Sequence, residues 1–186
     1  LHSFPTRRAS ELYRTGQTYL DAPTVVRSLM ENVCRNGALL LNLTQHGRGN
    51  LDPEVIRICQ DVGAWLKING AAVYGSRPFE TFGENSVRYT RRGGDVYAAL
   101  LDWNGGSLTL KALRAGGTTL GKVSAVELLG SEVGMTFVQD QQGLTVTPGG
   151  PVLPLSGMAD QRLASLCRVL RIRHDKGWLN DDDPGA

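Results

Sequence analysis

The run Arg35-Asn36-Gly37-Ala38-Leu39-Leu40-Leu41-Asn42 decides how this chain is built. Asn36 and Gly37 predict the end of a helix, because glycine readily takes the left-handed conformation that stops one. Residues 38–43 predict a short strand with apolar side chains at consecutive positions, which is typical of a parallel strand buried on both faces. One such strand occurs, and the backbone of a lone parallel strand cannot satisfy its hydrogen bonds. We therefore expect its neighbours to lie outside this sequence, as in a fragment of a larger protein.

A helix is predicted on each side of this strand. Residues 19–36 carry apolar side chains at helical spacing, with Asp21 as the N-cap and Pro23 in the first turn. The second helix begins with Asp52 as its N-cap and Pro53 at its first position, and it ends at Asn69. Its apolar stripe is expected at Val55, Ile56, Cys59, Val62, Gly63, Leu66 and Ile68. The order helix, strand, loop, helix is one turn of a βα repeat with the helix of the preceding unit attached.

Beyond residues 74–78, which predict a linker, the pattern changes from helical to strand-like. Two apolar runs, 87–90 and 96–101, flank Arg91-Arg92-Gly93-Gly94-Asp95, a strong hairpin signal. Further short runs follow at intervals of about ten residues, which favours an antiparallel sandwich or barrel. These runs are residues 107–110, 122–129, 136–139, 144–147 and 166–173.

The fold class is therefore predicted as α+β: the last βα unit of a (β/α)₈-like barrel followed by an antiparallel β-sandwich. The segment 1–12 is expected to be a non-native or disordered scar, since it resembles a translated sequencing adapter. Residues 13–76 would form the end of the barrel and residues 77–174 the sandwich. The tail 175–186 is expected to be disordered.

Composition excludes several classes of protein. The net charge is +2 and charges of both signs are interspersed, unlike the basic surface of a nucleic-acid-binding protein. No apolar run approaches the ~18–20 residues that cross a membrane. The cysteines Cys34, Cys59 and Cys167 lack the spacing of metal ligands and are expected to be small buried hydrophobic residues. We expect no metal site and no cofactor.

Four blocks of sequence carry a resemblance. Residues 36–42 read NGALLLN, residues 49–54 GNLDPE, residues 63–70 GAWLKING and residues 73–78 VYGSRP. In this order they resemble the C-terminal half of the family 29 α-L-fucosidases, and the resemblance covers roughly residues 13–172. It implies a (β/α)₈-like catalytic barrel followed by a C-terminal β-sandwich, with this chain supplying the end of the barrel and the sandwich.

The resemblance also implies an activity, the retaining hydrolysis of terminal α-L-fucose from glycoconjugates by two carboxylates. Both carboxylates are expected upstream, so this chain alone should be inactive. We expect Asp52 to be an N-cap, Asp95 a turn residue and Glu54 a first-turn charge favoured by the helix dipole. The substrate would be a fucosylated glycan, without nucleic acid or membrane as partner. Family habit implies a secreted, periplasmic or lysosomal enzyme.

The substrate-binding segment is predicted from the barrel geometry. Active sites of such barrels lie at the C-terminal ends of the strands, which indicates Asn42, Thr44, Gln45 and His46. The alternatives are structural: a buried Asn42 would tie down the barrel rim, and His46 would be solvated. The sequence departs from the family pattern at Thr44, Gln45 and Arg48, which leaves the conformation of this loop open.

Two other functions stay open at this point. The sandwich alone would be a non-catalytic carbohydrate-binding module if an exposed row of aromatic side chains lay on one face, with Trp103 as a candidate contact. Alternatively, the sandwich would only support the barrel and help subunits to associate as a homo-oligomer. An apolar patch around residues 39–43 is expected in either case, because the neighbouring strands are missing.

Overall fold

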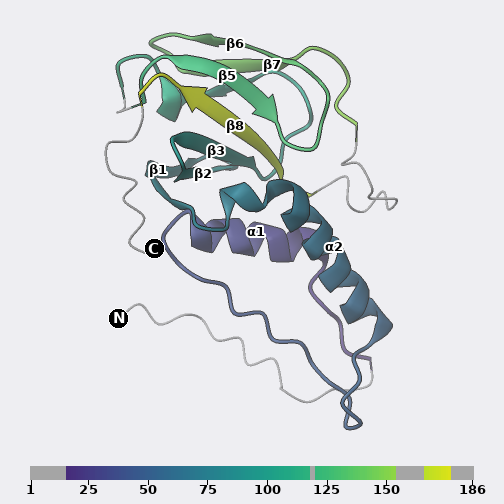
Figure 1. Ribbon diagram of the computed structural model, residues 1–186. Helices are drawn as coiled ribbons and strands as arrows, with labels where there is room; N and C mark the ends of the chain where they lie inside the picture. Colours follow the sequence, from purple (N-terminus) through teal and green to yellow (C-terminus); the bar gives the residue numbers. More distant parts are fainter. Residues whose placement is uncertain (1–15, 118–119, 154–165, 177–186) are drawn as a thin grey trace.

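The chain forms three layers in the computed structural model, which describes residues 16–117, 120–153 and 166–176 (Figure 1). Two helices form one outer layer, a five-stranded sheet lies in the middle, and a three-stranded sheet forms the other outer layer. The predicted N-terminal scar and nearly all of the predicted tail lie outside the described residues. The predicted boundary between barrel and sandwich stays a prediction.

Helix α1 (Ala22–Val33) begins and ends close to where the sequence predicts. The Asp21 side chain accepts a hydrogen bond from the amide of Thr24 at 3.0 Å, as an N-cap does. At the other end Asn36, with φ of 61°, takes the left-handed conformation expected of Gly37. Gly37 is needed for a different reason, because a Cβ there would lie 3.1 Å from the carbonyl oxygen of Asn32.

Helix α2 (Pro53–Asn69) begins at Pro53 as predicted, but its buried stripe is phased differently. Its buried side chains are those of Val55, Ile58, Trp65 and Asn69. Ile56, expected inside, is 44% exposed. A short 3₁₀ turn, η1 (Gly70–Ala72), follows the helix and leads into the sheet.

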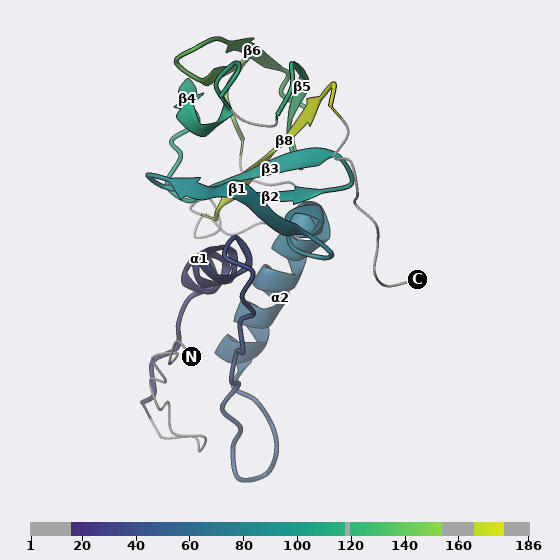
Figure 2. The same cartoon turned by 90° about the vertical axis from the view of Figure 1, so that its left-hand side faces the viewer.

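The predicted buried strand at residues 38–43 is not formed, and this prediction is corrected. The segment runs without strand partners among the described residues, away from the sandwich and down to the loop that precedes α2 (Figure 2). Leu40 is 94% exposed, and Leu41 and Leu43 are also exposed. The physical reason is the absence of neighbouring strands. A buried parallel strand needs a neighbour on each edge, and the described chain supplies neither.

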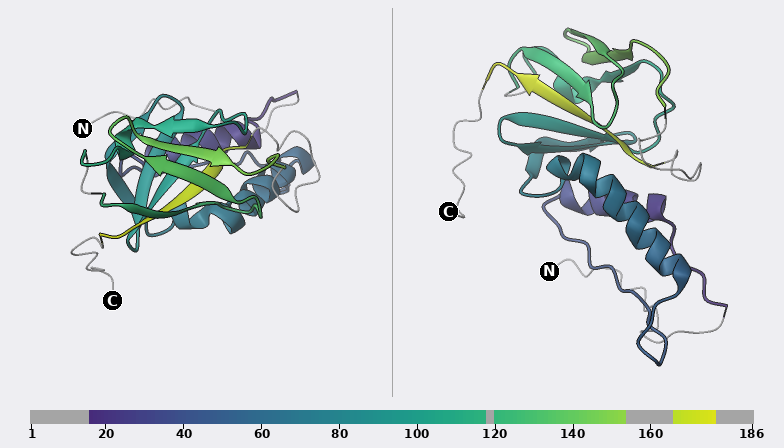
Figure 3. Two further views of the ribbon diagram at one scale, coloured as in Figure 1. Left: turned by 90° about the horizontal axis from the view of Figure 1, so that it is seen from above. Right: turned by 45° about the vertical axis from the view of Figure 1, so that its right-hand side comes forward.

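The β-sandwich is confirmed, with two antiparallel sheets. The five-stranded sheet has the order β1-β2-β3-β8-β5 and the three-stranded sheet the order β4-β7-β6. Their bounds are β1 (Arg77–Glu84), β2 (Val87–Arg92), β3 (Asp95–Leu100), β4 (Leu108–Leu110), β5 (Val123–Leu128), β6 (Met135–Gln139), β7 (Leu144–Pro148) and β8 (Arg168–His174). A 3₁₀ turn, η2 (Lys111–Leu113), follows β4. Seen from above, the two sheets are stacked over the helices (Figure 3).

The hairpin between β2 and β3 has the predicted turn. Gly93 and Gly94 have φ of 55° and 86°, the pair of positive values that a type I′ turn requires. Asp95, expected to be a turn residue, instead opens β3 and accepts from the Arg171 guanidinium at 2.6 Å. Strand β1 was not predicted, because residues 74–78 read as a linker and Arg77 is already part of this strand.

Two hydrophobic cores hold the layers together. One lies between the two sheets and includes Tyr89, Leu110, Leu144 and Leu170. The other lies between the helices and the outer face of the five-stranded sheet, where residues of α1, α2, β3 and β8 pack together. The helices are therefore packed onto the sandwich itself.

The two edges of the sandwich are closed by side chains. At one edge Gln139 of β6 accepts from the amide of Val123 and donates to the carbonyls of Leu113 and Gly121, at 2.9, 3.2 and 3.3 Å. At the other edge Glu84 of β1 accepts from the Tyr89 hydroxyl at 2.5 Å and from the amide of Ala112 at 3.1 Å. The Gln139 bonds join β6 to the start of β5 and to η2, and the bond from Ala112 to Glu84 joins η2 to β1, so each edge links the two sheets without a backbone ladder.

Candidate functional site

The loop between residues 44 and 52 is held in shape by a cluster of polar side chains. Asp52 accepts from the Tyr19 hydroxyl at 2.5 Å, and its second oxygen lies 2.6 Å from Nε2 of His46. The amide of His46 donates to the carbonyl of Asn50, and residues Gln45 and Leu51 form an isolated antiparallel bridge. The loop is thus a small closed unit at the end of the molecule farthest from the sandwich (Figure 2).

The four predicted site residues differ in their surroundings. Thr44 is buried, and its hydroxyl accepts from the Gln17 amide at 3.0 Å. His46 is half-buried and bound to Asp52, so the prediction of a solvated histidine is wrong. Asn42 and Gln45 are exposed, and the expected burial of Asn42 is wrong because no neighbouring strand covers it. Gln45 and His46 both belong to the closed loop, whereas Asn42 lies in the exposed segment that precedes it.

Sequence reasoning missed the contribution of Asp52 and Tyr19. Asp52 stands at the N-cap position as predicted, yet its carboxylate caps no backbone amide and binds Tyr19 and His46 instead. These hydrogen bonds, that from Tyr19 foremost, hold the pKa of the Asp52 carboxyl below its usual value. No local pattern in the sequence indicates this contact, because Tyr19 and Asp52 are 33 residues apart.

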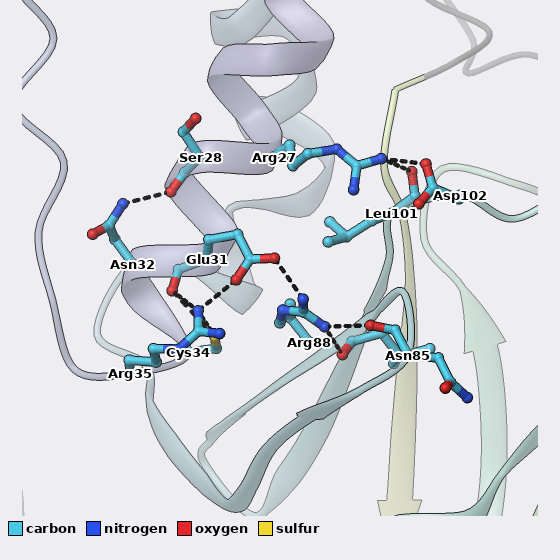
Figure 4. Close-up of polar contacts among 11 residues, drawn as sticks. Arg27, Ser28, Glu31, Asn32, Cys34, Arg35, Asn85, Arg88, Leu101 and Asp102 are labelled. Carbon is cyan, nitrogen blue, oxygen red and sulfur yellow. Dashed lines mark hydrogen bonds and ion pairs between the residues drawn. The ribbon is translucent and has the colours of Figure 1, made fainter. Parts of the chain in front are cut away.

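A second polar cluster fastens α1 to the five-stranded sheet (Figure 4). Arg27 and Glu31 lie one turn apart on one face of α1, and Arg35 follows four residues later, just after the helix ends. Arg27 pairs with Asp102 just after β3, and Glu31 pairs with Arg88 of β2 at 2.6 Å. The guanidinium of Arg35 lies over the ring of Phe82 in β1, 4.3 Å from its centroid. These contacts tie α1 and the residues just after its end to β2, to β1 and to the turn that follows β3.

The electrostatics of this second cluster are those of structural ion pairs. Arg88 holds the pKa of the Glu31 carboxyl below its usual value, and Arg35 adds to the effect. Arg27 does the same for Asp102. Together with Asp21 and Asp52, these are the described carboxyls whose pKa departs clearly from its ordinary value, and all four move downward. A general acid needs the opposite shift, so none of the four has the character of a glycosidase acid.

Helix α2 is anchored to the sheet by Trp65. Its side chain is fully buried, and Nε1 donates to the carbonyl oxygen of Cys167 at 2.6 Å. Trp65 is therefore part of the core between the helices and the five-stranded sheet. Burial also raises the pKa of the Cys167 thiol to about 12, which keeps this group protonated and unreactive.

Trp103 has a structural role in the sandwich. Its ring packs against the core between the sheets, and Nε1 donates to the carbonyl of Gly106 at 2.8 Å. Within the described ranges, no three histidine, cysteine or acidic side chains lie close enough to hold a metal ion. Neither described helix combines the length and apolar character of a membrane-spanning segment.

Two family models match the chain in consecutive order. The model described as alpha-L-fucosidase matches residues 6–71, and the model described as the alpha-L-fucosidase C-terminal domain matches residues 81–158. The first match covers both helices and the loop cluster, and the second begins within β1 and covers most of the sandwich.

Curated relatives and solved structures agree with these matches. The chain is 37% identical over 105 residues to an alpha-L-fucosidase of Branchiostoma floridae, covering 54% of this chain and 23% of that protein. It is 31% identical over 140 residues to the tissue alpha-L-fucosidase of Mus musculus, covering 72% of this chain and 30% of that protein. The chain therefore spans about a quarter to a third of the length of these relatives.

The fold is shared with solved fucosidase structures. Alpha-L-fucosidase isoenzyme 1 from Paenibacillus thiaminolyticus aligns with a TM-score of 0.69 at 24% identity, over 89% of this chain and 37% of that chain. The alpha-fucosidase of Thermotoga maritima aligns with a TM-score of 0.65 at 20% identity, over 87% of this chain and 36% of that chain.

Proposed function

Because this chain belongs to the family 29 α-L-fucosidases, we propose that it is the C-terminal part of a retaining exo-glycosidase that removes terminal α-L-fucose from glycoconjugates. The observation that carries this proposal is the order of the two family matches along one fold. The alpha-L-fucosidase model ends at residue 71, within η1 and just after α2, and the C-terminal model begins at residue 81, in the first strand of the sandwich.

The chemistry of such an enzyme requires two carboxyl groups about 5 Å apart, one as nucleophile and one as acid and base. The described carboxylates in the clusters above are already engaged. Asp52 binds Tyr19 and His46, Glu31 binds Arg88, and Asp95 binds Arg171. This supports the proposal that the reacting pair belongs to a part of the enzyme outside this chain.

The exposed leucines of residues 38–43 support the same proposal. In the complete barrel this segment would be a strand, and Leu40 and Leu41 would be covered by the neighbouring strands and helices. Asn42, Thr44, Gln45 and His46 would then lie at the C-terminal rim, where the sugar binds. In this arrangement Asp52 and Tyr19 would position His46 at the rim.

The test compares two proteins from the same gene. The 186-residue chain should not release the chromophore from an aryl α-L-fucoside, whereas a longer product that includes the upstream region should. The sugar first released by the longer product should be the α-anomer, as read by ¹H NMR, because two displacements restore the configuration. Hydrolysis by the 186-residue chain would contradict the assignment of the carboxylates, and an inactive longer product that folds would contradict the function.

A further inference from the structure

Side-chain hydrogen bonds join the segment that leads into α1 to the loop that leads into α2. Gln17 donates to the Thr44 hydroxyl at 3.0 Å, and Tyr19 donates to the Asp52 carboxylate at 2.5 Å. In a βα repeat the chain enters each helix from the face at which the strands end, and this face carries the active site of a barrel. Two consecutive loops of the repeat are therefore connected on the face where a substrate binds.

The position of the proton on His46 follows from its contact with Asp52. One carboxylate oxygen of Asp52 accepts from Tyr19, and the other lies 2.6 Å from Nε2 of His46. The hydrogen bonds from Tyr19 and His46 hold the pKa of the Asp52 carboxyl below its usual value, so the group is ionised at neutral pH. An ionised carboxylate only accepts hydrogen bonds. Nε2 must therefore carry the proton, and in the neutral form of the ring Nδ1 is then the accepting nitrogen.

His46 is held in place by the backbone of its loop as well as by Asp52. Its amide donates to the carbonyl of Asn50 at 2.9 Å, and its carbonyl accepts from the amide of Gly49 at 2.8 Å. Its side chain is 27% exposed, so part of the ring is accessible to a ligand. The ring is thus fixed in position before any ligand arrives, which lowers the entropy cost of binding.

We propose that Asp52, held by Tyr19, is a positioning residue that presents Nδ1 of His46 to a hydroxyl group of the bound glycan. This inference rests on the proposed function, because the glycan is the substrate proposed for the complete enzyme. A sugar hydroxyl suits this nitrogen, since it is neutral and has a proton to donate. A metal ion suits the pair less well, because no third histidine, cysteine or acidic side chain joins it within the described ranges.

The loss of Asp52 should weaken binding through its effect on His46. Without the carboxylate the ring can turn, and its proton can move to Nδ1, where it would block the acceptor. The hydrogen bond to the glycan would be equally strong in the ground state and the transition state. Its loss should therefore raise KM by about 3- to 10-fold and leave kcat unchanged.

Steady-state kinetics of the longer gene product on a fucosylated oligosaccharide test the proposal. His46→Ala and Asp52→Ala should each raise KM by that factor. The double variant should have the KM of His46→Ala alone, because Asp52 acts through His46. Tyr19→Phe and Asp52→Asn should have smaller effects, since the first keeps the ring and the second keeps an accepting oxygen.

The matched control is Asp61→Ala, which also removes a carboxylate from this part of the chain. Asp61 pairs with Arg57 within α2, so its loss should leave KM unchanged. Nitrogen NMR spectra of the 186-residue chain give a second readout that needs no activity. The His46 ring should carry its proton on Nε2 in the wild-type chain and should lose this preference in Asp52→Ala.

The proposed function and this inference fail in different ways. A folded longer product that does not cleave an aryl α-L-fucoside would contradict the proposed function and, with it, the glycan contact. An active product in which His46→Ala leaves KM unchanged would overturn the inference alone. So would a double variant in which the two single effects multiply, and so would a wild-type chain with the proton on Nδ1.

Discussion

At the scale of single residues, Trp65 does most to join the helices to the sandwich. Among the described residues it is the largest fully buried side chain, and its Nε1 donates to the carbonyl of Cys167, the residue just before β8. Its burial was predictable from its neighbours in the helix, but its partner was not. The Cys167 carbonyl lies 102 residues away in the sequence, and no local pattern indicates such a contact.

Trp65→Phe should lower the free energy of unfolding by about 1–3 kcal/mol, because the buried Cys167 carbonyl loses its donor. Urea unfolding followed by circular dichroism measures this change. Trp103→Phe is the matched control, since its hydrogen bond to Gly106 is exposed and its loss should cost less. Equal effects of the two substitutions would contradict the anchoring role of Trp65.

The Asp52 carboxylate should make the loop sensitive to acid. Its pKa in the folded chain is lowered by Tyr19 and His46, so its contribution is present above the unfolded pKa and is lost as the pH falls through the folded one. The ring signals of Tyr19 and His46 in NMR spectra, followed from about pH 6 to about pH 3, should report the loosening.

Asp52→Asn should remove this acid transition, whereas Asp61→Asn should keep it. Asp61 forms an ion pair with Arg57 within α2, at 3.8 Å, and lies outside the loop. A transition that persists unchanged in Asp52→Asn would show that another group controls the loop.

At the scale of elements, the sequence predicts what local chemistry controls. The type I′ turn at Gly93 and Gly94, the start of α1 at Asp21 and the start of α2 at Pro53 all follow from nearby residues. The strand predicted at residues 38–43 depends on partner strands that the described chain does not supply. Its apolar pattern alone is therefore not enough for a strand to form. Which residues of α2 are buried depends on which face of the helix packs against the sheet. Tertiary packing decides this, and the local sequence does not.

The row of contacts from α1 to the strands should contribute measurably to stability. Arg88→Met removes the partner of Glu31, whose pKa is held low mainly by Arg88, and should cost about 1 kcal/mol at neutral pH. As the pH falls through the lowered pKa of Glu31, the wild-type chain should lose this advantage and the two curves should converge. Urea unfolding at several pH values measures both effects.

Arg57→Met is the control for this element-scale prediction. Its ion pairs with Glu54 and Asp61, at 3.7 and 3.8 Å, lie within α2. Its cost should be at most about 0.5 kcal/mol. A loss as large as that of Arg88→Met would mean that the contact between α1 and β2 has no special weight.

At the scale of the whole molecule, one apolar segment stands apart from two well-packed cores. Leu40 and Leu41 are exposed, while Leu39 is partly buried against the helix core. Leu40→Lys should reduce the binding of a hydrophobic dye such as ANS without lowering the melting temperature, because no packing is lost. Leu113→Lys, at a fully buried position, should instead unfold the sandwich. Unchanged dye binding in Leu40→Lys would show that the exposed apolar surface that binds the dye lies elsewhere.

The hydrogen bonds that Gln139 forms between the two sheets have a consequence for the local opening of the structure. One amide group bonds to three backbone positions in two segments, Leu113 at the end of η2 and Gly121 and Val123 at the start of β5. Any fluctuation that frees the side chain releases all three at once. In a hydrogen-exchange experiment the Val123 amide should therefore exchange at the same rate as the neighbouring amides. Gln139→Leu should speed that exchange. The amide of Ala112, which is bonded to Glu84 at the opposite edge, should keep its protection.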